Sequence, residues 1–373
     1  MRFLHTADWQ LGMTRYFLAG EAQARYTAAR IEGIVRIGEV ARAHDCAFVL
    51  VCGDVFETNA VPPQVVRRAL AAMEQIGLPV LLLPGNHDPL DASSVYSSRE
   101  FLSARPANVT VLSAGSHPVS AGVEVVAAPW ANKRPTEDLV ARAVAELPAD
   151  GTLRVVAGHG ALDVLSQDRQ DVRHIALAGV EAALADGRIH YLGLGDRHSL
   201  TDVGATGRVR YPGTHEVTAF DETAPGQVLV VDLSAERVQA TAVRVGEWTF
   251  TEIDAVLHGA ADVDALDARL AALPDKERTV VRLAPSGALT VAERARLDDL
   301  LAARGDLFAS LRLREDAAVH VLLDDGDLEA LGVGGYARSA AEELAELAAG
   351  DGPDAATAGA ALTLLHRLTG AGR

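Results

Sequence analysis

Five short polar clusters, each directly after an apolar run, contain the residues of this chain that are best suited to chemistry. The first follows Phe3-Leu4, and the others are GDVFE at 53–57, GNHD at 85–88, GHG at 158–160 and GDRH at 195–198. A single such residue is more often a turn residue or a helix cap. Carboxylate, amide and imidazole donors in five clusters instead suit a pair of divalent metal ions. The candidate residues are Asp8, Gln10, Asp54, Asn86, His87, His159, Asp196 and His198.

The segments that must position these residues predict a layered α/β domain over residues 1–250. Continuous apolar runs such as AFVLVC and LPVLLL read as buried strands, and they alternate with amphipathic stretches such as residues 22–43. In open α/β sheets, ligands bind at the carboxyl ends of the strands, where all five clusters stand. The stretch TEDLVARAVAEL predicts a helix with Thr136 as its N-cap.

The pattern changes near residue 250, and the remaining chain predicts two further parts. Residues 255–325 alternate helical and strand-like runs, which is typical of a small α+β domain. From about residue 326 the chain is acidic and helical in pattern, as in YARSAAEELAELAAG. We therefore expect a separate helical tail over residues 326–373.

Composition limits the classes of function. The net charge of −17 over 373 residues argues against binding nucleic acid by bulk charge. It does not exclude phosphate chemistry, because bound cations or a local arginine patch can reverse the potential at one site. No run approaches the roughly 20 apolar residues of a membrane helix, and we see no signal peptide. The two cysteines, Cys46 and Cys52, read as buried thiols of a cytoplasmic protein and not as a disulfide.

The order of the five clusters resembles that of the calcineurin-like metallophosphoesterases. The surrounding segments HTADWQLG, CGDVFE, LPGNHDPLD, and YLGLGDRHS followed by YPGTHE, are similar to the SbcD branch of DNA-repair exonucleases. The resemblance covers roughly residues 1–245. It implies a layered α-β-β-α metallophosphoesterase sandwich, with a smaller α+β capping domain and a helical C-terminal tail.

The resemblance also implies a two-metal site. Asp8 and His198 would hold the first metal ion, Asp54 would bridge both ions, and Asn86 and His159 would hold the second. The cofactors would be two divalent metal ions, Mn²⁺ in the first place and Mg²⁺ in the second.

A different role is implied for His87, and two positions depart from the family pattern. His87 would stand beside the scissile phosphate and stabilise or protonate the leaving group without being a primary ligand. Gln10 replaces the usual histidine of Asp-x-His, and Asp196 replaces the first histidine of Gly-His-x-His. An added carboxylate and a neutral amide oxygen are hard donors, which favour Mn²⁺ or Mg²⁺. In the alternative interpretation, Asp196 is too short to reach the metal and binds through a water molecule or pairs with Arg197.

The function implied is that of a metal-dependent phosphodiesterase, a DNA exonuclease or endonuclease acting in DNA repair. The implied partners are DNA, a second copy of the chain, and an SbcC-type coiled-coil ATPase docked on the acidic tail, with no membrane. Two alternatives stay open. One is a phosphoesterase for nucleotides or other small phosphates, which the negative charge favours. The other is a degenerate scaffold protein, which two changed ligand positions would allow.

Overall fold

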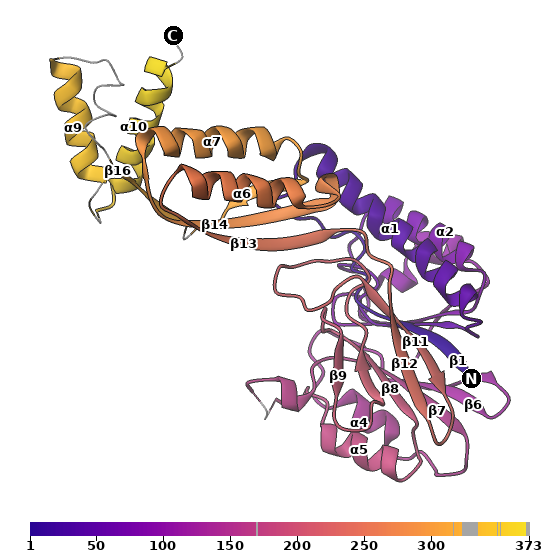
Figure 1. Cartoon of the computed structure of the whole chain (residues 1–373). Helices are drawn as coiled ribbons and strands as arrows, with labels where there is room; N and C mark the ends of the chain where they lie inside the picture. The colour runs from indigo at the N-terminus through magenta and orange to yellow at the C-terminus, as the bar shows by residue number, and fades with distance from the viewer. Residues whose placement is uncertain (169–170, 316, 323–334, 349, 351, 371–373) are drawn as a thin grey trace. The chain divides into compact units, whose positions relative to one another are not determined.

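The structure is a computed structural model, and it describes residues 1–168, 171–315, 317–322, 335–348, 350 and 352–370. Two compact units, residues 1–248 and 249–373, are described separately below (Figure 1). The expected start of the tail near residue 326 lies outside the described residues. Within the described ranges, no helix has both the length and the apolar character needed to span a bilayer.

Two six-stranded sheets form the centre of the first unit. The first sheet contains β1 (Arg2–Thr6), β2 (Val49–Cys52), β3 (Val80–Leu83), β4 (Val109–Val111), β11 (Gln227–Leu233) and β12 (Val238–Arg244). The second contains β5 (Gly115–Ser120), β6 (Val123–Ala127), β7 (Leu153–His159), β8 (Tyr191–Gly195), β9 (Thr201–Val203) and β10 (Val209–Tyr211). Their strand orders are β12-β11-β1-β2-β3-β4 and β5-β6-β7-β8-β10-β9. Strands β1 to β4 are parallel to one another, as are β6, β7 and β8.

Helices cover the outer face of each sheet. The first sheet carries α1 (Gly20–Ala43), α2 (Pro63–Ile76) and α3 (Arg99–Ala104), and the second carries α4 (Leu139–Val144) and α5 (Leu177–Ala185) (Figure 1). Two short 3₁₀ turns, η1 (Val95–Ser97) and η2 (Asp163–Leu165), complete the unit. A buried layer that includes Phe3, Leu50, Val155 and Tyr191 lies between the sheets. The α-β-β-α order confirms the predicted fold class.

The start of α4 differs from the prediction. Asp138, and not Thr136, is the N-cap, because Asp138 Oδ1 accepts a hydrogen bond from Ala141 N at 2.8 Å. Asp138 Oδ2 also accepts from Ala176 N at 2.9 Å, next to the start of α5. One carboxylate therefore serves two segments at once, which fixes the first turn two residues later than expected.

The second unit is built on a four-stranded sheet in which every pair is parallel. Its strands are β13 (Thr249–Leu257), β14 (Thr279–Thr290), β15 (Ser310–Leu313) and β16 (Ala318–Leu322). The long strand β14 pairs with β13, and its other edge pairs first with β15 and then with β16. The helical elements are α6 (Ala260–Ala272), η3 (Lys276–Arg278), α7 (Val291–Gly305), α9 (Tyr336–Ala348) and α10 (Ala355–Gly370). Helices α6 and α7 cover the same face of this sheet (Figure 1).

Candidate metal centre

The predicted site residues stand where parallel strands of both sheets end. Asp8 and Asp54 follow the parallel neighbours β1 and β2. Asn86 follows β3, which is parallel to β2. In the second sheet, His159 is the last residue of β7 and is in register with Gly195, directly before Asp196. Because the two sheets pack face to face, the ends of their strands deliver these side chains to one place.

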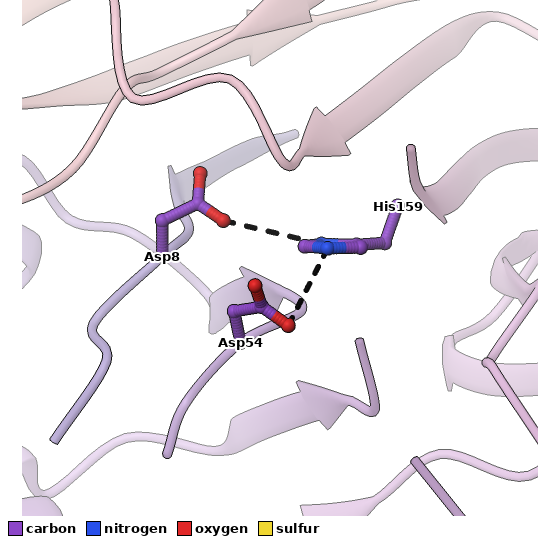
Figure 2. Close-up of side chains that lie close together, drawn as sticks. All are labelled: Asp8, Asp54 and His159. Carbon is purple, nitrogen blue, oxygen red and sulfur yellow. Dashed lines mark ion pairs between the residues drawn. The ribbon is translucent and has the colours of Figure 1, made fainter. Parts of the chain in front are cut away.

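Asp8, Asp54 and His159 form the centre of this group (Figure 2). One potential ligand atom from each lies within 4.8 Å of the others, and all three residues are buried. Asp54 Oδ1 is 3.4 Å from His159 Nε2, and Asp8 Oδ1 is 4.0 Å from His159 Nδ1. This spacing suits a divalent cation held between the two sheets.

The protonation of His159 favours a positive charge beside its ring. Its Nδ1 is 2.9 Å from the carbonyl oxygen of Cys52, so this nitrogen carries the proton and donates it. Its Nε2 then faces three oxygens: Asn86 Oδ1 at 2.7 Å, Asp54 Oδ1 at 3.4 Å and Asp196 Oδ1 at 3.9 Å. A nitrogen lone pair among acceptors is unfavourable unless a cation or a second proton lies between them. Burial alone would lower the pKa of His159, but the surrounding carboxylates raise it well above its usual value.

A second set of donors surrounds His198. Its Nε2 is 3.1 Å from Gln10 Nε2, and its Nδ1 is 2.7 Å from Thr218 Oγ1 and 3.1 Å from Glu222 Oε1. Asp8 Oδ2 and Gln10 Oε1 are buried without a hydrogen-bond partner among the described residues. Burial raises the pKa of Asp8 to about 7, in spite of the attraction of His198 and His159. Buried oxygens that lack donors fit a divalent cation, so the residues present suit the metal ions that the fold implies.

The backbone is shaped to bring these groups together. The described chain has seven non-glycine residues with positive φ, and four are candidate ligands: Asp8 (53°), Gln10 (41°), Asp54 (53°) and Asp196 (93°). Such residues are uncommon and cluster at functional sites. Backbone hydrogen bonds from Asp8 N to Gly53 O (3.1 Å) and from Gln10 N to Asp54 O (2.8 Å) hold the first two loops side by side.

Two glycines are required at this centre for space. A Cβ added at Gly85 would lie 2.2 Å from Asp54 Oδ1, and one added at Gly195 would lie 1.9 Å from the carbonyl oxygen of Cys52 and 2.8 Å from His159 Nδ1. A larger residue at either position would displace a candidate ligand or the carbonyl that orients one.

His87 lies beside this centre and has different contacts. Its backbone N donates to Asp54 Oδ1 at 2.9 Å, and its ring Nδ1 donates to the carbonyl oxygen of Glu57 at 2.8 Å. The next residue, Asp88, was given no role from the sequence, but it fixes the turn. Its buried carboxylate accepts from Gly85 N at 2.8 Å, Phe56 N at 3.0 Å and Tyr96 Oη at 2.6 Å. Burial raises the pKa of Asp88 to about 6, and the charge of Asp54 adds to this effect.

Three further residues near the centre were missed by sequence reasoning. Thr214 Oγ1 is 2.9 Å from the carbonyl oxygen of Asp8, and Thr218 and Glu222 contact the His198 ring. Thr214 lies in the segment YPGTHE, which was noticed only as part of a resemblance. Thr218 and Glu222 lie in an irregular segment with no motif or periodic pattern that could have identified them.

Comparisons with known proteins agree with this geometry. Residues 1–199 match the calcineurin-like phosphoesterase family. The SbcD component of the nuclease SbcCD from Escherichia coli (strain K12) is 27% identical over 261 residues, which is 60% of this chain and 62% of that protein. The SbcD component from Rhodobacter capsulatus is 35% identical over 94 residues, 24% of this chain and 22% of that protein. The chain thus spans about three-fifths of the length of the Escherichia coli relative that it matches.

A crystal structure from Thermus thermophilus aligns with 65% of this chain and 98% of its own, at a TM-score of 0.42 and 11% identity. The family match covers more than half of the 373 residues, and its region contains Asp8, Asp54 and His159. The chain therefore belongs to the calcineurin-like phosphoesterase family, as a metallophosphoesterase with a buried Asp/Asp/His candidate metal site.

Proposed function

We propose that this protein is a metal-dependent phosphodiesterase that cleaves DNA with two divalent cations, Mn²⁺ before Mg²⁺. The observation that carries the proposal is that two groups of donors, around His159 and around His198, share the buried carboxylates of Asp8 and Asp54. The similarity to the SbcD component of nuclease SbcCD supports DNA as the substrate. The residues that would hold the ions are Asp8, Gln10, Asp54, Asn86, His159, Asp196 and His198.

When bound, the two cations would supply the positive charge that stabilises a phosphodiester and the negative charge developing on it. The hydrogen bond from His159 Nδ1 to the carbonyl of Cys52 keeps Nε2 directed at the oxygens of Asn86 and Asp54. Asp196 Oδ1, at 3.9 Å from His159 Nε2, reaches the same group of atoms. Arg197 donates to Thr201 Oγ1 at 2.9 Å, so its guanidinium is engaged elsewhere. We therefore favour Asp196 as a ligand, directly or through water, over the alternative in which it pairs with Arg197.

His87 is proposed to protonate the leaving oxygen of the cleaved DNA. Because its Nδ1 proton is held by the carbonyl of Glu57, Nε2 is the nitrogen that can give up a proton to a substrate. The bond from His87 N to Asp54 Oδ1 ties the position of this ring to a proposed metal ligand. No metal ligation by His87 is needed for this role.

The proposal extends to partners through the same relative. By analogy with the SbcD component of nuclease SbcCD, we propose that the chain acts as a homodimer and with a coiled-coil ATPase of SbcC type. The acidic helix α9 is the proposed docking segment.

The test is a comparison of hydrolysis rates on three substrates in Mn²⁺: linear duplex DNA, single-stranded DNA and a chromogenic phosphomonoester. We expect cleavage of DNA and slow monoester hydrolysis, with Asp54→Asn as the inactive control. A clear preference for the monoester would instead support a phosphoesterase for small phosphates, which the net charge of −17 favours. Inactivity on every substrate, with no metal bound, would support the scaffold alternative.

A further inference from the structure

The segment from Thr214 to Glu222 lies against the donors around His198. At its beginning, Thr214 Oγ1 contacts the carbonyl oxygen of Asp8, and Glu216 accepts hydrogen bonds from Glu247 N and Trp248 N. Its end therefore extends from a buried anchor. This end carries Thr218 and Glu222, both beyond residue 199, where the family match stops.

Glu222 is engaged with His198 and Thr218 through both of its oxygens. Its Oε1 is 3.1 Å from His198 Nδ1 and also accepts from the hydroxyl of Thr218, and its Oε2 accepts from Thr218 N at 2.8 Å. Thr218 Oγ1 is itself 2.7 Å from His198 Nδ1. The Glu222 side chain is only 5% exposed, so water does not compete strongly for this carboxylate.

These contacts decide which nitrogen of His198 carries the proton. An ionised carboxylate can only accept, so Nδ1 must donate, and the lone pair is left on Nε2. We propose that Glu222, together with Thr218, is the positioning residue of His198: it fixes the ring and its tautomer so that Nε2 is offered to the first metal ion. This inference rests on the proposed function, which makes His198 a ligand. Partners of this kind raise the basicity of a ligating imidazole and typically change metal affinity by about 10–100-fold.

The same tautomer gives Gln10 a defined part. A lone pair on His198 Nε2 explains why Gln10 presents its amide nitrogen, at 3.1 Å, while Gln10 Oε1 has no partner among the described residues. An ion at this position would require the amide to turn over and offer Oε1. Loading of the first ion therefore breaks one hydrogen bond, which the second position, around His159, does not require.

The experiment compares Glu222→Gln with Asp221→Asn in the full chain. Both changes remove one negative charge, but Asp221 is the exposed neighbour and makes no contact with His198 in the described structure. Calorimetric titration with Mn²⁺ should resolve two equivalents in the wild type. In Glu222→Gln, one equivalent should weaken by about 10–100-fold while the other is unchanged. Asp221→Asn should keep both within about twofold.

A second readout reports the tautomer without any metal. Long-range ¹H–¹⁵N spectra of the metal-free protein should show His198 protonated at Nδ1, with the Nε2 form growing in Glu222→Gln and in Thr218→Val. His198→Gln identifies the signal, and Thr218→Val keeps the test open if Glu222→Gln fails to fold.

Unchanged affinity and tautomer in the variants would overturn the inference. Equal weakening of both equivalents with a lowered unfolding temperature would also overturn it, since that result means general structural damage. A wild-type protein that binds two ions and cleaves no DNA would overturn the proposed function and leave this inference standing. A wild-type protein that binds no ion would overturn both.

Discussion

Replacing Asp8 by asparagine should make the metal-free protein more stable, because the buried carboxylate of Asp8 is held in a site that lacks a permanent cation. Burial raises its pKa from an ordinary 3.8 to about 7. At pH 8 the carboxylate is ionised in both states, and the difference in pKa corresponds to at most about 4 kcal/mol of lost stability. Asparagine is nearly isosteric, is uncharged, and can still accept the hydrogen bond that Asp196 N donates to Asp8 Oδ1 at 2.9 Å.

The sign of the effect depends on pH and on metal. A carboxyl group with a raised folded-state pKa contributes full stability below about pH 3.8 and loses it as pH rises through about 7. The gain from Asp8→Asn should therefore shrink to less than about 2 kcal/mol at pH 5. With Mn²⁺ at 1,000 times its dissociation constant, the wild type gains about 4 kcal/mol. The variant gains little, so the order of stability should reverse.

The assay is urea unfolding of both proteins at pH 5 and pH 8, each with a chelator and with excess Mn²⁺. Asp221→Asn is the matched control, because it removes an exposed carboxylate nearby and should change none of the four values by more than about 0.5 kcal/mol. If Asp8→Asn destabilises the metal-free protein at pH 8, the carboxylate serves mainly as a structural acceptor, and the reasoning that it awaits a cation is refuted.

Three further variants test the proposed chemistry. Asp54→Asn should abolish turnover and most Mn²⁺ binding while the fold survives, since Asp54 is proposed to contact both ions; wild-type hydrolysis in this variant would rule out the site. His87→Ala should slow DNA cleavage by about 10²–10⁴-fold at unchanged metal content, and loss of metal, measured by elemental analysis, would make His87 a ligand instead. The double change Gln10→His and Asp196→His should raise affinity for Zn²⁺ or Co²⁺ relative to Mn²⁺ in competitive titrations. A uniform gain for all metals would mean that the present site is merely weakened.

Much of the fold and the centre of the site could be predicted because both depend on short-range patterns. Apolar runs of four to seven residues became the parallel strands β1, β2, β3, β7 and β8. Polar residues directly after such strands must meet at one edge, which is why Asp8, Asp54 and His159 were found from sequence and do converge. Their assignment as ligands, like that of the other five site residues, stays a prediction.

The remainder depends on contacts between distant segments. Glu222 reaches His198 across 24 residues through an irregular segment, and no local pattern encodes that approach. The N-cap of α4 was misplaced for a similar reason, since Asp138 is also bound by Ala176 from 38 residues away. The tautomers of His159 and His198 follow from a backbone carbonyl and a carboxylate that only the folded chain supplies.

The positive φ angles at the metal centre restrict which substitutions evolution can test there. Asp8, Asp54 and Asp196 all adopt this conformation, and apart from glycine it is tolerated best by asparagine, aspartate and histidine. Asparagine, aspartate and histidine are also metal-binding side chains, so backbone sterics and coordination chemistry select the same residue types. An exchange of histidine for aspartate at position 196 therefore stays within the tolerated set. Single substitutions at these three positions can change the preferred metal more readily than they can remove every donor.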